Sequence, residues 1–515
     1  MSRPTGCDDM ALARVRGAVI DGVAGVNVLV EADVASGLPS VGMVGLAGAT
    51  VAEARWRVRS AVGNSGLPWP RGRITIGLSP ADIPKIGTGL DLPVAVALLR
   101  AGGQVPEVGD AVFIGELGLD GQLRATAGAL PAALAAHAHG HRVLYVSRAD
   151  EAVVRLLPDM VVHGVDDLRQ LVAILRGERE PSPSAGGCGA AADIEDAPDL
   201  SEVRGHAMAR FGLEVAAAGG HHLAMVGAPG VGKSMLALRL ASVLPDLADD
   251  EALEVTALHS LMPRGEADFV VQRRPPVQMP HHSSSAASLL GTARGARVVP
   301  GAVTLAHRGV LVLDEAPEFS RPSLEGLRQP LEQGSIAVHR VGRAAQLPAR
   351  FQLVLTANPC PCGLSVGLGA ECSCPPVAKR RYAERLSGPL MDRIDVRLTV
   401  ARPSLAELAV PSASSAEVRE RVEAARDRAR LRFVDEGFAL NARIPGQLLR
   451  SRWAPDPEAA DLLDDSLRNG GSLRGVDRVL RMAWTIADLR GQARPKASDV
   501  VMALGLRSGE TAPTA

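Results

Sequence analysis

The stretch GAPGVGKS, from Gly227 to Ser234, decides the fold. It matches the phosphate-loop pattern G-x-x-x-x-G-K-[ST], in which backbone N–H groups cradle nucleotide phosphates. The run HHLAMVG before it (residues 221–227) predicts a short buried strand, and KSMLALRLASVL (residues 233–244) predicts a helix. We therefore expect a nucleoside triphosphate site in an α/β fold, with Lys233 at the β- and γ-phosphates and Ser234 on Mg²⁺. The residues expected to bind the nucleotide are Gly227, Pro229, Gly230, Val231, Gly232, Lys233 and Ser234.

A second apolar run ends in two carboxylates. GVLVLDEAPEF (residues 309–319) predicts a parallel strand buried on both faces, with Asp314 and Glu315 at its carboxyl end. Ligands of α/β sheets gather at this end of the strands. We expect Asp314 to complete the Mg²⁺ shell that Ser234 begins, and Glu315 to orient and deprotonate the attacking water. The sequence thus predicts hydrolysis of ATP as well as binding.

Four of the six cysteines fall within fifteen residues. Cys360, Cys362, Cys372 and Cys374 form two C-x-C pairs around a glycine-rich loop. Four thiolates can hold Zn²⁺ in a closed tetrahedron, so a structural zinc site that folds a protrusion is the preferred interpretation. A redox pair or free thiols are the alternatives.

Composition narrows the class of protein. A length of 515 residues predicts about three domains. The formal net charge of −1 gives no overall field that would recruit nucleic acid or an anionic membrane. Aromatic residues, at 3%, are too few for an extended base-stacking platform. The sequence has neither a signal-peptide pattern nor a membrane-spanning run, so we expect a cytoplasmic protein without a membrane partner.

The first 176 residues alternate strand-like and helical segments and predict a separate α/β domain. KIGTGLDLPVA (residues 85–95) and GELGLDGQLRATAGALPAALAA (residues 115–136) resemble the Lon-protease-type domain of magnesium-chelatase-like proteins. Where Lon proteases carry the catalytic serine and lysine, the alignment places Gly89 and either Leu130 or Pro131. We therefore expect a scaffold or binding domain without peptidase activity. The polar residues near its turn, interpreted as helix caps and surface charges, are Asp82, Lys85 and Asp91.

The phrase LSGPLMDRID (residues 386–395), with the phosphate loop and the cysteine cluster, resembles the ComM/YifB family of magnesium-chelatase-like AAA+ ATPases. The likeness covers nearly the whole chain. It implies that Asn358, after the strand-like run FQLVLTAN, senses the γ-phosphate and places the lytic water. It also implies that Arg393 is a finger reaching into the neighbouring subunit's site, and that Arg474 contacts the γ-phosphate from a helical lid.

Alternatives stay open for these arginines. Arg385 competes with Arg393 for the role of finger, and Arg393 could instead pair with Asp392 or Asp395 at the surface. The segment GSIAVHRVGRAAQLPAR (residues 334–350) predicts a hairpin, which is either a solvated charged hairpin or, by resemblance, one that faces a pore.

The predicted organisation follows these segments. We expect a non-proteolytic Lon-like domain (1–176), a flexible linker (177–197), an AAA+ core (198–398) with a four-cysteine insertion (360–374), a helical lid (399–507) and a disordered tail (508–515). The resemblance implies a hexameric, ATP-driven motor that remodels DNA, by branch migration or helicase action, in natural transformation or recombination. The alternative is a chelatase-like or chaperone-like ATPase that remodels a protein partner.

Overall fold

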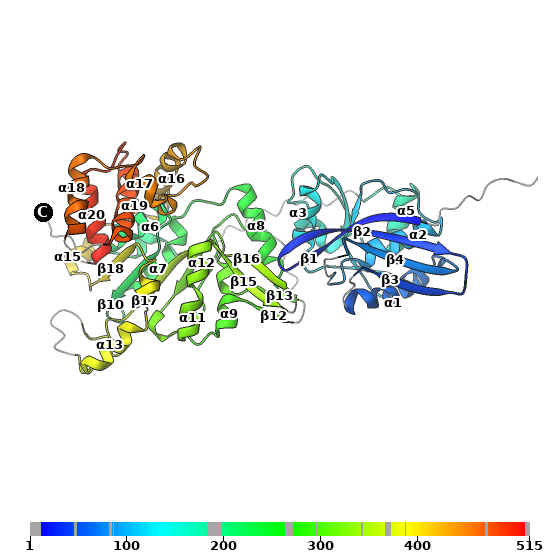
Figure 1. Cartoon of the computed structure of the whole chain (residues 1–515), viewed down its shortest axis with the longest axis horizontal. Coiled ribbons are helices and arrows are strands. Elements are labelled where there is room, and N and C mark those ends of the chain that lie inside the picture. The colour runs from blue at the N-terminus through cyan, green and yellow to red at the C-terminus, as the bar shows by residue number, and fades with distance from the viewer. Residues whose placement is uncertain are drawn as a thin grey trace, which may run out of the picture.

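The computed structural model describes residues 12–45, 49–81, 85, 87–182, 198–262, 271–294, 297–340, 343–365, 372–386, 388–468 and 472–509. Figure 1 shows these residues in two lobes, one from the first third of the chain and one from the remainder. Asp82, most of the predicted linker (183–197) and most of the predicted tail (510–515) lie outside the described residues. None of the described helices is both long and apolar enough to cross a membrane.

The first lobe is built on a seven-stranded mixed sheet with the order β3-β4-β2-β1-β5-β8-β9. Its strands are β1 (Leu12–Asp21), β2 (Ala24–Ala35), β3 (Ser40–Val44), β4 (Arg73–Ser79), β5 (Val112–Phe113), β8 (Val143–Ser147) and β9 (Val161–Val165), with a separate pair formed by β6 (Glu116–Leu117) and β7 (Leu123–Arg124). Its helices are α1 (Ala49–Asn64), α2 (Asp91–Ala101), α3 (Ala129–Ala138), α4 (Arg148–Val154) and α5 (Leu168–Leu175). The predicted alternation of strands and helices is confirmed.

The interpretation of Lys85 and Asp91 as surface charges is wrong. Lys85 is 0% exposed and Asp91 is 1% exposed. Helix α2 is buried on nearly every side, so the carboxylate in its first turn goes into the interior with it. There the Arg57 guanidinium holds Asp91 through two hydrogen bonds of 2.8 Å. Burial raises the pKa of Asp91, and the hydrogen bond and charge of Arg57 oppose that rise.

The second lobe contains a five-stranded parallel sheet with the order β11-β14-β17-β10-β18. Its strands are β11 (Val277–Gln278), β14 (Val310–Leu313), β17 (Gln352–Ala357), β10 (Leu223–Gly227) and β18 (Val396–Val400). The helices among them are η1 (Leu200–Glu202), α6 (Ala207–Gly219), α7 (Lys233–Arg239), η2 (Ala241–Val243), α8 (Asp249–His259), α9 (Ala286–Leu290), α10 (Ala302–Leu305), η3 (Ala316–Glu318), α11 (Arg321–Gly326), α12 (Arg328–Gln333), α13 (Pro376–Glu384) and α14 (Gly388–Met391).

Two elements of this lobe were predicted from the sequence. The predicted hairpin is confirmed as the antiparallel pair β15 (Ser335–Arg340) and β16 (Arg343–Pro348), and a second pair is formed by β12 (Thr292–Arg294) and β13 (Arg297–Val299). The helix predicted over residues 233–244 is shorter, because α7 ends at Arg239 and the 3-10 turn η2 follows.

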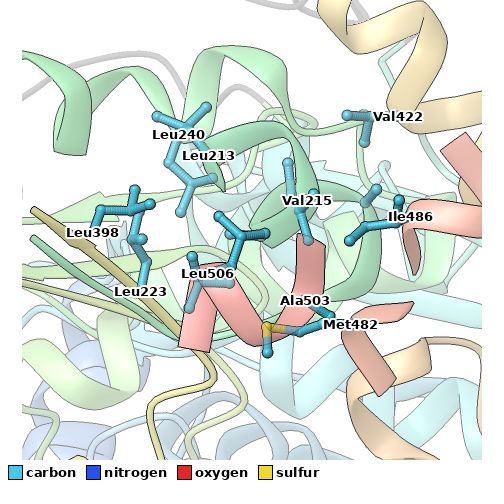
Figure 2. Packing of buried hydrophobic residues seen from close by; sticks show 14 of the residues in the cluster. Leu213, Val215, Leu223, Leu240, Leu398, Val422, Met482, Ile486, Ala503 and Leu506 are labelled. Atoms are coloured by element: carbon cyan, nitrogen blue, oxygen red, sulfur yellow. The ribbon is translucent and has the colours of Figure 1, made fainter. Parts of the chain in front are cut away.

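The C-terminal helices pack on the edge of this sheet. They are α15 (Leu405–Ala409), α16 (Ser415–Arg432), η4 (Asn441–Arg443), α17 (Gly446–Arg450), α18 (Pro457–Arg468), α19 (Leu473–Leu489) and α20 (Ala497–Ser508). Figure 2 shows the shared core, in which Leu213 of α6 and Leu398 of β18 lie in one cluster with Met482 and Ile486 of α19 and Leu506 of α20. Burial of each such side chain contributes about 1.5–3 kcal/mol, so these helices are held firmly against α6 and β18.

Candidate functional site

The phosphate loop leaves β10 and enters α7 with the geometry that its glycines allow. Gly230 and Gly232 have φ of 74° and 92°, in the left-handed region that favours glycine. A Cβ at Gly227 would lie 2.3 Å from the Val400 carbonyl oxygen, so only glycine fits beside β18. Val231 is 5% exposed and anchors the loop in the core, while Pro229 is exposed. The loop therefore presents its backbone at the carboxyl end of the sheet.

Lys233 crosses from this loop to the neighbouring strand. Its ammonium donates to the carbonyl oxygens of Gly227 and Ala228 at 2.8 Å each, and to Asn358 Oδ1 at 3.1 Å. Asn358 directly follows β17, which pairs with β10. Burial lowers the pKa of Lys233, and the charges of Asp314 and Glu315 oppose that shift. The structure thus brings Lys233, Asn358 and both carboxylates to one end of the sheet, as the sequence predicted.

Ser234 and Asp314 meet at the same place. The Ser234 hydroxyl donates to both oxygens of the Asp314 carboxylate, at 2.9 and 3.0 Å. A hydroxyl and a carboxylate are hard oxygen donors of the kind that Mg²⁺ prefers, and Mg²⁺ usually keeps several waters beside one or two such protein ligands. This pair therefore fits the predicted magnesium site.

Thr356 is a site residue that the sequence reasoning missed. It is 0% exposed, its hydroxyl donates to Asp314 Oδ1, and it accepts a 3.0 Å hydrogen bond from the Glu315 backbone N–H. Glu315 has a φ of 52°, a left-handed conformation that costs a non-glycine residue about 1–3 kcal/mol. Thr356 thus secures a strained backbone turn that sets the direction of the Glu315 side chain. The sequence does contain one signal for this role, which is the single hydroxyl side chain in the mostly apolar run of β17.

Arg393 lies at the opposite end of the sheet. It precedes β18, which runs parallel to β10, whereas the phosphate loop follows β10. A five-residue strand spans about 17 Å, so Arg393 is separated from its own phosphate loop by roughly the depth of the sheet. Its guanidinium contacts Glu332 of α12 and the carbonyl oxygen of Pro389. The alternative of a surface ion pair with Asp392 or Asp395 is therefore not what the structure shows.

Arg474 lies near Arg393. Burial lowers the pKa of Arg393 first, followed by the charges of Arg328, Arg478 and Arg474, so Arg474 is within electrostatic range of Arg393. Arg478, one helical turn after Arg474 on α19, also donates to Asp395, two residues after Arg393. This position does not favour the expected contact of Arg474 with the γ-phosphate in its own subunit.

Arg385, the competing candidate for the finger, lies at the phosphate-loop end. It donates to the Pro317 carbonyl oxygen at 2.9 Å and to Glu318 at 3.1 Å, just after the Asp314–Glu315 pair. Arg385 therefore lies beside its own subunit's carboxylates, whereas Arg393, which is itself paired with Glu332, lies at the end of the sheet away from them.

The four cysteines of the predicted zinc site come together. The sulfur atoms of Cys360 and Cys362 are 3.4 Å apart, Cys372 Sγ is 3.6 Å from each of them, and all four sulfurs lie within 4.8 Å of one another. Zinc–sulfur bonds of about 2.3 Å in a tetrahedron place sulfurs about 3.8 Å apart, so the cluster fits Zn²⁺.

This cluster also touches the nucleotide site. Gly363 packs against Pro229 so closely that a Cβ there would lie 2.5 Å from the proline ring. Tyr382 of α13 hydrogen-bonds the backbone of Asn358. The cysteine insertion is therefore placed to support the phosphate loop and the strand end that carries Asn358.

Three family models together match most of the chain. "Subunit ChlI of Mg-chelatase" matches residues 30–150, "Magnesium chelatase, subunit ChlI" matches 199–408, and "Magnesium chelatase, subunit ChlI C-terminal" matches 412–507. The uncharacterized protein Rv2897c of Mycobacterium tuberculosis is 45% identical over 504 residues, covering 97% of this chain and 99% of the relative. YifB of Escherichia coli is 40% identical over 489 residues (93% and 94%), and the competence protein ComM of Haemophilus influenzae is 36% identical over 509 residues (97% and 98%).

Proposed function

Because this chain belongs to the ComM/YifB family of magnesium-chelatase-like AAA+ ATPases, we propose that it hydrolyses ATP at sites shared between the subunits of a ring. The observation that carries this proposal is the distribution of charged groups over the two ends of the parallel sheet. Lys233, Ser234, Asp314 and Asn358 converge at one end, whereas Arg393 lies at the other. One subunit therefore supplies a nucleotide-binding half, and its neighbour supplies an arginine half.

The proposed roles follow from the contacts. The loop backbone from Gly227 to Gly232 holds the phosphates, and the Lys233 ammonium, already directed across the loop, moves onto the β- and γ-phosphates. Ser234 and Asp314 hold Mg²⁺, which neutralises charge on the phosphate oxygens when it is bound. Glu315 takes the proton of the attacking water, and Asn358 positions that water.

The arginines complete the site from the neighbouring subunit. An arginine supplied in trans stabilises the charge that develops on the transferred phosphoryl group. Arg393 and Arg474 are at the correct end of the sheet for this role, and Arg474 is exposed without an ion pair among the described residues. Hydrolysis then requires assembly, for which we propose a hexamer on the basis of the family.

We further propose that the motor remodels DNA in the cytoplasm, with the Lon-like domain as a non-proteolytic docking module and zinc in the cysteine cluster. The similarity to a competence protein supports the choice of DNA. A role in remodelling a protein partner is the second candidate, and the match to a subunit of magnesium chelatase is compatible with it.

The test is ATP turnover by the full-length protein with single-stranded DNA, duplex, forks and four-way junctions. We expect branched or single-stranded DNA to stimulate turnover, and the apparent affinity to fall steeply with salt because phosphate contacts release counterions. The Lys233→Ala variant controls for contaminating ATPases. Turnover that no DNA stimulates would refute the DNA motor, and absence of turnover under all conditions would refute the ATPase itself.

A further inference from the structure

A continuous chain of polar side chains crosses the core between the sheet and α19. Arg478 donates to Asp395 Oδ1 at 2.8 Å, Asp395 Oδ2 is 2.9 Å from His221 Nδ1, and His221 Nε2 is 2.8 Å from the Thr485 hydroxyl. Asp395 is 5% exposed, and His221 and Thr485 are 0% exposed. Buried charges are costly unless they are paired, so this chain fixes the relative position of the two elements that it joins.

The first ion pair of this chain lies next to both candidate trans arginines. Asp395 follows Arg393 by two residues, and Arg478 follows Arg474 by one helical turn on the same face of α19. Burial alone would raise the pKa of Asp395, but the hydrogen bond from His221 and the charges of His221 and Arg478 hold it below its usual range. Asp395 therefore supplies a buried negative charge beside Arg393, Arg474 and Arg478.

We propose that Arg478 and Asp395 form a positioning pair that presents Arg393 and Arg474 to the neighbouring subunit as one unit. The inference rests on the proposed trans site. Without the pair, the strand that follows Arg393 and the first turns of α19 lose their direct charged link. Asp395 is then left buried without its arginine partner at the junction from which Arg393 and Arg474 project.

The row of polar side chains continues from Thr485 to Asn441, which donates to the Thr485 hydroxyl at 3.2 Å, and then to a second ion pair that offers a matched control. Arg432 and Asp488 form a comparable pair, with side chains 11% and 1% exposed against 16% and 7% for Arg478 and Asp395. Asn441 also donates to Asp488, at 2.7 Å. Asp488 is ten residues beyond Arg478 on α19, which places it about 15 Å farther along the helix from Arg393. Loss of this second pair removes a similar buried ion pair without touching the arginine end.

The experiment mixes subunits and measures ATP turnover. Arg478→Gln alone should lose at least about tenfold in turnover while it binds a fluorescent ATP analogue normally, because its own phosphate loop is intact. Mixed one to one with Lys233→Ala, it should recover about a quarter of wild-type turnover, since half the sites are intact and half of these face an intact neighbour. Arg478→Lys should retain part of the activity, and Arg432→Gln should keep most of it despite a similar fall in melting temperature.

Two results would overturn the inference. One is an Arg432→Gln variant that loses turnover as severely as Arg478→Gln, which would mean that both changes act through stability. The other is an Arg478→Gln defect that Lys233→Ala subunits do not relieve although they relieve Arg393→Ala. If Lys233→Ala subunits fail to relieve Arg393→Ala as well, the trans site itself is refuted, and the positioning pair with it.

Discussion

Replacement of Thr356 by valine tests the construction of the hydrolytic site, because the two side chains have nearly the same shape. The change removes the hydroxyl that donates to Asp314 and accepts from the Glu315 N–H at 3.0 Å. It opens no cavity of note in a position that is 0% exposed. Any effect therefore comes from the lost hydrogen bonds.

The magnitude follows from these contacts. A buried group left without its hydrogen bond costs about 1–3 kcal/mol, and the left-handed backbone of Glu315 costs a similar amount. Without the hydroxyl, the conformation that aligns Glu315 becomes less stable by about this free energy. Since each 1.36 kcal/mol corresponds to a factor of ten in rate, turnover should fall by about tenfold to a hundredfold. Binding of ATP should change little, since Thr356 makes no contact with Lys233 among the described hydrogen bonds.

Thr304 provides the matched control. It is also 0% exposed, but its hydroxyl has no hydrogen-bond partner among the described residues. Thr304→Val removes an unsatisfied buried group, so turnover should stay unchanged and the melting temperature should stay equal or rise. The assay is steady-state ATP turnover at saturating Mg²⁺, with equilibrium binding of a fluorescent ATP analogue and a thermal melt. Turnover of Thr356→Val within about twofold of wild type would refute the argument.

Three further predictions concern other contacts. Glu315→Gln should bind ATP and retain it unhydrolysed, which filter binding of labelled nucleotide measures; normal turnover would remove Glu315 as the base. The purified protein should contain one zinc per chain by elemental analysis, and joint Cys362→Ser and Cys372→Ser changes should remove the zinc and lower the melting temperature. The control is Cys188→Ser, which changes a cysteine of the predicted linker that is not part of the cluster and should alter neither. His222 accepts a 3.0 Å hydrogen bond from the Leu353 N–H, and burial lowers its pKa from 6.5 to about 4. Its neutral form stabilises the fold fully above pH 6.5, and up to about 3 kcal/mol is lost as the pH falls from 6.5 to 4. The free energy of unfolding, measured by urea titration at a series of pH values, should therefore fall less between pH 6.5 and 4 in His222→Gln than in wild type. An equal fall in the two proteins would contradict the role of His222.

The phosphate-loop end of the site could be predicted from the sequence because its signals are local. A glycine pattern, an apolar strand and a terminal Asp–Glu pair each occupy one stretch of chain, and parallel pairing brings their ends together. Thr356 could not be found in this way. Its role depends on the register of β14 against β17, where Leu313 pairs with Leu355 and so places Asp314 beside Thr356.

The buried charges of the first lobe and the place of Arg474 beside Arg393 could not be predicted, for a related reason. Lys85 and Asp91 lie on either side of a short segment with two glycines, a pattern typical of the surface. Both are buried nevertheless, and α2, which begins at Asp91, is itself buried on nearly all sides. Arg474 lies in the first turn of the long helix α19. The position of that helix is decided by apolar contacts with α6 and β18 that no local pattern encodes.

That packing bears on how the proposed motor moves. The C-terminal helices and the sheet share one cluster that includes Leu213, Leu398, Met482, Ile486 and Leu506. Separating them would expose each side chain at about 1.5–3 kcal/mol, a sum comparable with the whole net stability of a typical domain, about 5–15 kcal/mol. A wide hinge between sheet and helices within one subunit is therefore disfavoured. Since the phosphate-binding and arginine groups lie at opposite ends of this rigid unit, we expect the displacement driven by hydrolysis to occur where two subunits meet.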